Sequence, residues 1–177
     1  MTSKNKGPNF AGSVRAVSLG KPDAIVICCS AFDAAHYVES FVANKLNTRC
    51  FDLVALPGGA FGLSTSNSDE SARRFLTESV KFLCSNHMPS HILLFGHIPC
   101  AHYLAMCHGN DNPDDLRALI LGDMQSAAQA IRGVCNASVV IEGYVAELRG
   151  NSIEFERADI LPSLQPPCGR AHEYFGC

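Results

Sequence analysis

The chain has 177 residues, of which 47% are hydrophobic and 18% are charged, and its formal net charge at pH 7 is -3. This length fits one domain with a sizeable core, and a slightly acidic chain without a basic run argues against nucleic acid and anionic membranes as partners. Residues 1–14 are polar and unlike a secretory signal, and no apolar run approaches the roughly 18–20 residues of a membrane helix, so we expect a cytoplasmic protein.

Nine cysteines are many for a chain of this size. Without a secretory signal, free thiols or metal ligands are expected rather than disulfides. Cys84 and Cys107 fall within helix-like patterns, and we predict that they pack as small hydrophobic side chains.

The first half of the chain predicts a strand, a helix and a second strand. Residues 23–30, DAIVICCS, form a continuous apolar run that is typical of a strand buried on both faces. Residues 32–46 then place apolar side chains at helical spacing. A second buried strand is predicted over residues 50–56, and Gly58 and Gly59 follow it, which permits unusual backbone shapes and close approach to a site.

A polar loop then leads to a helix and a third strand. Asp69 or Ser71 is expected to cap the helix, which continues to about Cys84. The third strand is predicted over residues 90–95 and is expected to break at Gly96.

The last part of the chain predicts a long helix and a hairpin. Pro113, followed by two aspartates, suits the start of a helix that continues to about Arg132. A fourth strand over residues 137–148 is followed by the turn 149–152 and a short strand at 153–155.

Strands that alternate with helices predict an α/β fold, with a mostly parallel central sheet flanked by helices and an antiparallel hairpin at one edge. We expect one α/β zinc-binding domain over residues 21–160. An N-terminal arm over residues 1–20 precedes it, and a C-terminal tail over residues 161–177 follows it.

The zinc prediction rests on side chains at the ends of these strands. His97 and Cys100 follow the third strand as a His-x-x-Cys pair, and Cys29 ends the first. Carboxyl ends of parallel strands meet at one edge of a sheet, so Cys29, the Gly58-Gly59 turn and the pair are expected to converge. Two thiolates and an imidazole favour zinc over magnesium or calcium. The alternative is a buried His97 bonded to backbone beside two packing cysteines.

These motifs resemble the small, divergent members of the β-class carbonic anhydrase family. That family has a strand ending in Cys-x-Asp-x-Arg, then a Gly-rich turn and a strand ending in His-x-x-Cys. Cys29-Ser30 matches the start of the first motif, residues 56–60 resemble the turn, and residues 97–100 match the third motif. The resemblance implies a zinc ion held by Cys29, His97 and Cys100, water or another ligand in the fourth position, and a homodimer or higher homo-oligomer.

The chain departs from the family at the first motif. Ala31 stands where the family has Asp, and Asp33 stands where it has Arg. The family's pair orients the zinc-bound water, and losses of this kind commonly lower activity about 10–100-fold. Asp33 and His102 are the candidate catalytic replacements, with His36 as a further nearby histidine. The alternatives are helix capping for Asp33, an ordinary polar contact for His102 and solvent exposure for His36.

The resulting hypothesis is reversible hydration of CO2, or of a close analogue such as COS or CS2, by zinc-bound hydroxide, with Gly58 and Gly59 as candidate substrate-binding residues. The alternative is a non-catalytic zinc-binding relative with a structural or regulatory role. A third interpretation, a redox-sensing thiol protein, rests on the adjacent Cys28 and Cys29. The tail adds a further Cys/His pattern, formed by Cys168, His172 and Cys177, that could bind a metal or supply a fourth ligand.

Overall fold

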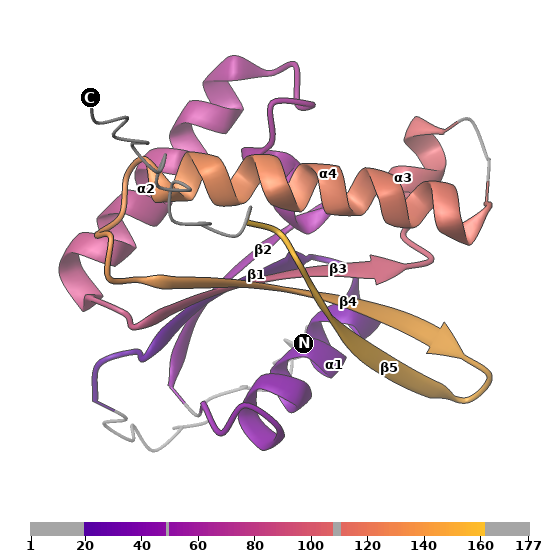
Figure 1. Cartoon of the computed structure of the whole chain (residues 1–177), viewed down its shortest axis with the longest axis horizontal. Helices are drawn as coiled ribbons and strands as arrows, with labels where there is room; N and C mark the ends of the chain where they lie inside the picture. Colours follow the sequence, from indigo (N-terminus) through magenta and orange to yellow (C-terminus); the bar gives the residue numbers. More distant parts are fainter. Residues whose placement is uncertain (1–19, 49, 108–110, 162–177) are drawn as a thin grey trace, which may run out of the picture.

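The computed structural model describes residues 20–48, 50–107 and 111–161 (Figure 1). Apart from residues 20 and 161, the predicted N-terminal arm and C-terminal tail lie outside these ranges. The metal-binding pattern of Cys168, His172 and Cys177 therefore lies outside the described residues as well.

The centre of the fold is one five-stranded sheet with the strand order β2-β1-β3-β4-β5. Its strands are β1 (Ala24–Cys29), β2 (Phe51–Leu56), β3 (His91–Ile98), β4 (Val140–Arg149) and β5 (Ser152–Ala158). The first four strands pair in parallel and β4 pairs with β5 antiparallel. The predicted mostly parallel sheet with an antiparallel edge hairpin is confirmed.

Helices cover both faces of this sheet (Figure 1). They are α1 (Phe32–Asn44), the 3-10 helix η1 (Gly59–Leu63), α2 (Glu70–His87), α3 (Ala101–Met106) and α4 (Pro113–Arg132). Helix α1 lies on one face of the sheet, and α2 and α4 lie on the other. Asp69 caps α2 by accepting a hydrogen bond of 3.0 Å from the backbone N–H of Ala72. Asn112 caps α4 in the same way through the N–H of Asp114.

Alternation along β1 assigns its side chains to the two layers. Ile25, Ile27 and Cys29 face the core beneath α2 and α4, whereas Ala24, Val26 and Cys28 face α1. Successive side chains of a strand point to opposite faces, so Cys28 and Cys29 are separated by the sheet although they are adjacent in sequence. All six residues of β1 are buried, as the continuous apolar run predicted.

The prediction of a buried second strand is wrong. Strand β2 forms an edge of the sheet, its side chains are only partly buried, and Leu53 is 41% exposed. An apolar run of this length does not distinguish a central strand from an edge strand, because both positions bury at least one face.

The predicted break of the third strand at Gly96 is also wrong, since β3 continues to Ile98. A Cβ atom at Gly96 would collide with the side chain of Ile120 on α4. This glycine therefore permits close packing of helix on sheet rather than a turn, and His97 lies within the strand. Helix α3 accounts for the helix-like pattern at Cys107, which is its C-cap, whereas η1, with its buried Ala60 and Leu63, was not predicted.

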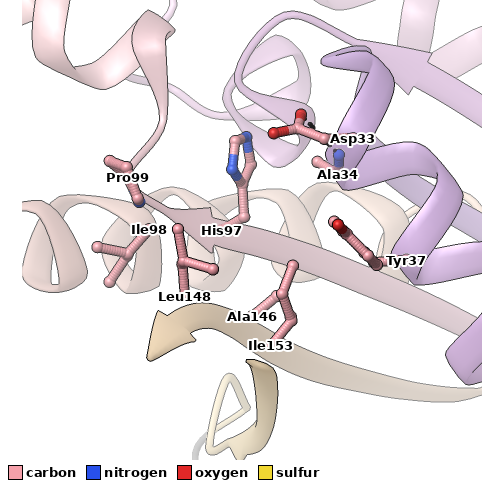
Figure 2. A pocket seen from close by; sticks show the side chains of 9 residues that line it. All are labelled: Asp33, Ala34, Tyr37, His97, Ile98, Pro99, Ala146, Leu148 and Ile153. Atoms are coloured by element: carbon pink, nitrogen blue, oxygen red, sulfur yellow. Dashed lines mark hydrogen bonds between the residues drawn. The ribbon is translucent and has the colours of Figure 1, made fainter. Parts of the chain in front are cut away.

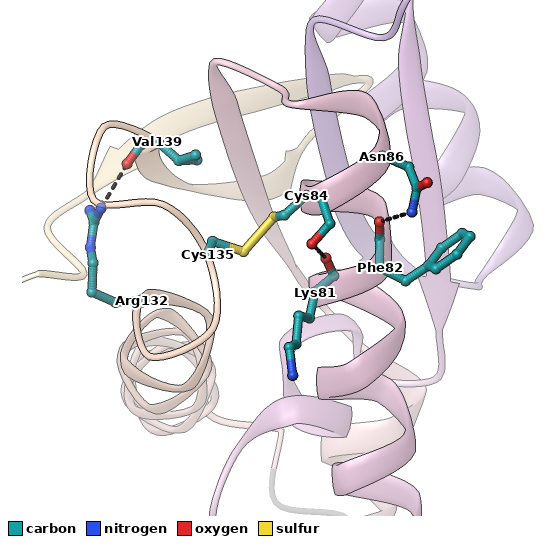
Figure 3. The surroundings of a disulfide bond; sticks show 8 residues. Lys81, Phe82, Cys84, Asn86, Arg132, Cys135 and Val139 are labelled. Atoms are coloured by element: carbon teal, nitrogen blue, oxygen red, sulfur yellow. Dashed lines mark hydrogen bonds between the residues drawn. A yellow bond between two sulfur atoms is a disulfide. The ribbon is translucent and has the colours of Figure 1, made fainter.

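Cys84 and Cys135 form a disulfide that joins α2 to the segment after α4 (Figure 3). The expectation that Cys84 packs as a free thiol is therefore wrong. The two cysteines are 51 positions apart, and nothing in their local patterns indicates that they meet. Among the described residues, no helix is both long and apolar enough to span a membrane.

Replacement of one disulfide partner tests this crosslink. We expect Cys135→Ser to lower the free energy of unfolding by about 2–4 kcal/mol, because the unfolded chain gains the freedom of a long loop. Urea denaturation of both proteins, with and without dithiothreitol, measures the difference. Dithiothreitol should lower the stability of the wild type and leave the variant unchanged; an unaffected wild type would contradict the crosslink.

Candidate metal centre

Three potential metal ligands come together at the carboxyl ends of β1 and β3. Cys29 is the last residue of β1, His97 is the penultimate residue of β3, and Cys100 is the N-cap of α3. Their ligand atoms all lie within 4.8 Å of one another, and the two sulfur atoms are 4.0 Å apart. The predicted convergence of these three residues is what the fold shows.

Cys29 and His97 can meet only because both lie at the ends of their strands. Cys29 belongs to the face covered by α2 and α4, whereas His97 follows Leu93 and Phe95 on the face covered by α1. Strand β3 extends beyond its pairing with β1, which ends at Ile27 and Leu94. Side chains from opposite faces can therefore meet past the end of the shorter strand.

The turn after β2 closes one side of the cluster. Gly58 and Gly59 both adopt positive φ angles, of 72° and 59°, which favour glycine. A Cβ atom on Gly59 would lie 3.0 Å from the carbonyl oxygen of Phe95 and 3.1 Å from the backbone nitrogen of Cys29. Absence of a side chain thus lets the turn pack against both strands. The suggested role of these glycines in substrate binding stays a prediction.

The surroundings of Cys29 stabilise its thiolate. A hydrogen bond from the Cys100 thiol lowers the pKa of Cys29, and His97 and the backbone N–H groups of Ala31 and Gly58 act in the same direction. The same bond and burial raise the pKa of Cys100, because the pair shares one negative charge when no cation is near. On the opposite face, burial raises the pKa of Cys28 to about 12, which makes it an unreactive thiol.

The cluster fits a zinc ion. Two Zn–S bonds of about 2.3 Å at a tetrahedral angle separate the sulfur atoms by about 3.8 Å, close to the 4.0 Å between Cys29 and Cys100. The Nε2 atom of His97 is buried and has no hydrogen-bond partner in the described part of the chain. A buried polar atom without a partner is unfavourable, and a metal bond would satisfy it. The alternative of a backbone-bonded His97 finds no support at this nitrogen.

A pocket of about 170 Å³ opens beside His97, between α1 and the β4–β5 hairpin (Figure 2). Its lining is mostly apolar, with an imidazole, a phenol and a carboxylate as its polar side chains. The lining residues are Asp33, Ala34, Tyr37, His97, Ile98, Pro99, Ala146, Leu148 and Ile153. The ring of His97 points toward Asp33 across this space (Figure 2).

Asp33 and His36 lie on α1, and their positions differ in relation to the pocket. Asp33 is in the first turn, after the N-cap Ala31, and its carboxylate accepts a 2.8 Å hydrogen bond from the N–H of Ala34. It therefore lines the pocket and stabilises the start of the helix, but it is not the cap itself. His36 is exposed, as its alternative interpretation expected.

His102 lies on α3, on another side of the cluster, and does not line this pocket. Its ring packs on Phe61 with 4.5 Å between the ring centroids, and it contacts the Gly58 turn. Its Nε2 atom is buried without a hydrogen-bond partner in the described residues. A catalytic role for His102 stays a prediction.

A buried polar network behind the cluster was not predicted from the sequence. Asp123 on α4 is only 4% exposed and accepts hydrogen bonds from the hydroxyls of Tyr103, at 2.8 Å, and Ser64, at 2.7 Å. Burial, together with the charge of Asp123, raises the pKa of Tyr103. The network joins α3, α4 and the end of η1, so it supports the segments that carry Cys100 and Gly58.

Comparisons with known proteins agree with this architecture at the level of structure. No protein-family model and no curated protein matches the sequence. The β-carbonic anhydrase CafA of Aspergillus fumigatus is similar over 79% of this chain and 76% of its own, with a TM-score of 0.52 and 10% identity. β-Carbonic anhydrase isoform I of Trichomonas vaginalis (TM-score 0.49, 9% identity) covers 81% of this chain and 87% of its own. Carbonic anhydrase of Streptococcus mutans (TM-score 0.48, 12% identity) covers the same shares.

Of these three structures, only that of the Aspergillus protein has a TM-score above 0.5, and its similarity to this chain is a similarity of fold. This chain has a β-carbonic anhydrase-like fold, as the three motifs predicted, with a Cys-His-Cys cluster that could hold a metal ion. Its sequence is only 10% identical to that of the Aspergillus protein.

Substitution of Gly59 tests the packing of the turn against the cluster. We expect Gly59→Ala to lower the free energy of unfolding by about 1–3 kcal/mol, since a side chain at positive φ is strained and the new Cβ crowds Cys29 and Phe95. Gly122→Ala is the matched control, because Gly122 is exposed on α4 with open space around it. That variant should be more stable by about 0.5–1 kcal/mol. Equal shifts in the two urea denaturation curves would contradict the assignment.

Proposed function

We propose that the protein is a zinc-dependent lyase of the carbonate dehydratase type, which hydrates CO2 reversibly or acts on a close analogue such as COS or CS2. The observation that carries the proposal is the cluster of Cys29, His97 and Cys100 beside an open pocket in a β-carbonic anhydrase-like fold. Fold similarity alone would not suffice, since one fold supports many functions.

Zinc bound in such a site lowers the pKa of a water ligand to about 7 and so supplies hydroxide at neutral pH. Cys29, His97 and Cys100 would hold the ion. No fourth His, Cys, Asp or Glu of the described residues joins this group. Three protein ligands with a free position are typical of catalytic rather than structural zinc sites.

Two features of the pocket suit the hydration of a small neutral molecule. Apolar walls formed by Ala146, Leu148 and Ile153 favour an uncharged substrate over water near His97. Asp33 is exposed at the mouth and can accept a proton from a reacting water and pass it to solvent. Ala31 provides no side-chain hydrogen bond to orient that water, so we expect a modest rate.

A non-catalytic zinc-binding protein is the alternative function, and Ala31 and Asp33 are the observations that favour it. An acidic Asp33 replaces a cation at this place in the family pattern, which removes a group that attracts bicarbonate. Both functions require zinc, but only the lyase requires turnover. Hydration of CO2 is therefore the property that distinguishes them.

We also propose a homodimer or higher homo-oligomer and a single zinc-binding domain over residues 21–160. The described helices and strands extend from Ala24 to Ala158 and belong to one sheet with its covering helices. Strand β2 offers an edge with the 41%-exposed Leu53, as an interface between subunits would require. The cytoplasmic location stays a prediction.

Stopped-flow CO2 hydration, on protein whose zinc content is known from elemental analysis, tests the proposal. We expect one zinc per chain and measurable hydration, with both lost in Cys100→Ala. Cys50→Ala is the matched control, since Cys50 is a free cysteine outside the cluster, and it should keep both. Zinc without hydration at pH 7–9 would favour the non-catalytic alternative, and absence of zinc would refute the ligand assignment.

Neutralisation of Asp33 tests its part in proton transfer. We expect Asp33→Asn to lower kcat for hydration by about 10-fold or more while the zinc content stays the same, because the amide cannot accept the proton. Asp114→Asn is matched to it, as Asp114 occupies the same position in the first turn of α4 and is exposed. If both variants have the wild-type kcat, Asp33 stabilises the helix and has no catalytic role.

A further inference from the structure

The pocket beside His97 continues into a larger groove along α1. The groove has a volume of about 440 Å³, and Tyr37, Leu148 and Ile153 line both spaces. Its full lining is Tyr37, Ser40, Phe41, Asn44, Lys45, Leu148, Asn151, Ile153 and Phe155. The two spaces therefore adjoin each other at these three shared side chains.

Helical and strand periodicity explain why the two adjoining spaces extend so far from the cluster. Asp33, Tyr37, Phe41 and Asn44 recur at intervals of three or four residues, so α1 presents a single face along both compartments. The distance along the helix axis from Asp33 to Asn44 is roughly 16 Å.

The opposite wall is one face of the sheet. His97 pairs with Ala146, which pairs with Phe155, and Leu148 pairs with Ile153. Cross-strand partners point to the same face, so the imidazole and the apolar side chains of the hairpin line one continuous surface.

This surface is apolar where it is accessible. Phe41 stacks on Phe155 at 4.1 Å between ring centroids and forms the base of the groove. Leu148 is 55% exposed and Tyr37 is 42% exposed, although both are large hydrophobic side chains. The groove lies within the range of about 300–1,000 Å³ that small-molecule sites occupy. It is far larger than a molecule of three atoms requires, given that one water occupies about 30 Å³ in the liquid.

Charge at the two ends limits what can bind. Among the described residues, Asp33 is the one acidic or basic side chain, histidine aside, that lines the compartment near His97, and it disfavours an anion there. Three exposed polar residues line the larger groove: Asn44, Lys45 and Asn151. An occupant with an uncharged head at His97 and an apolar chain toward α1 satisfies both conditions.

We propose that the groove is a chain-binding subsite and that the preferred substrate is an uncharged carbonyl compound with an apolar chain or ring, such as an alkyl ester. This inference rests on the proposed function for the reaction, and on the groove alone for binding. In ester hydrolysis, the water oxygen bonds to the carbonyl carbon and the bond to the alcohol oxygen breaks. The alcohol oxygen takes one proton from water, and a carboxylic acid is the second product.

Binding of unbranched primary alcohols with four, six and eight carbons tests the subsite without requiring turnover. An NMR titration of the full chain, as purified, measures affinity whatever the zinc content. We expect affinity to rise by up to about fourfold for each added methylene, because each one leaves water for the groove. Leu148→Arg should remove this dependence on chain length, and Leu119→Arg should retain it, since Leu119 is 43% exposed on α4, away from the cavity.

An affinity that is independent of chain length, or a Leu148→Arg variant that binds like the wild type, would overturn the subsite. Hydrolysis of p-nitrophenyl acetate, butyrate and hexanoate by zinc-containing protein then separates the two proposals. A kcat/KM that rises with chain length supports both. Chain-length-dependent binding without hydrolysis or CO2 hydration supports the subsite and refutes the proposed function. CO2 hydration without chain-length-dependent binding refutes the subsite and leaves the proposed function in place.

Discussion

Close packing of the Gly58-Gly59 turn against the ends of β1 and β3 is the constraint on which the candidate centre depends. The backbone of Gly59 approaches Phe95 and Cys29 so closely that no side chain fits between them. Three segments that are distant in sequence are thereby held at one corner of the sheet. The backbone N–H of Gly58 also lowers the pKa of Cys29, so the turn influences both the shape and the charge of the cluster.

The two sides of the cluster differ in rigidity and access. On the side of α3 and α4, Asp123 ties Tyr103 to Ser64 in a buried network whose members all have partners. Such a network specifies one arrangement, because any shift leaves a buried polar group unsatisfied. On the side of α1 and the hairpin, the lining is apolar and partly exposed. A fixed support behind the ligands and an accessible space in front of them are what a binding site requires.

The sequence predicted the mostly parallel sheet, the hairpin and the meeting of Cys29, His97 and Cys100 because those features depend on local periodicity and on where strands end. It did not predict that β2 is an edge strand. An apolar run indicates that at least one face of a strand is buried, but it does not indicate which strands lie beside it in the sheet. The sequence predicted a break at Gly96. The side chain that leaves no room for a Cβ atom there, that of Ile120, lies on a helix 24 positions later in the chain. The Cys84–Cys135 disulfide and the Tyr103–Asp123–Ser64 network were missed for the same reason: each joins residues whose proximity is created only by the fold.

The described part of the protein contains two pairs of neighbouring cysteines whose chemical requirements are opposite. Cys84 and Cys135 are joined beside Pro89 and Val139, where β3 and β4 begin. Cys29 and Cys100, at the ends where β1 and β3 finish, would have to remain thiols to hold the proposed metal ion. A reductant that protects the second pair also opens the first, and an oxidant that preserves the first can couple the second. A metal ion at the proposed site would resolve this conflict, because coordinated thiolates are shielded from oxidation while the remote crosslink stays intact. With the proposed zinc site, the order of exposure to zinc and to air would determine which form of the protein is obtained.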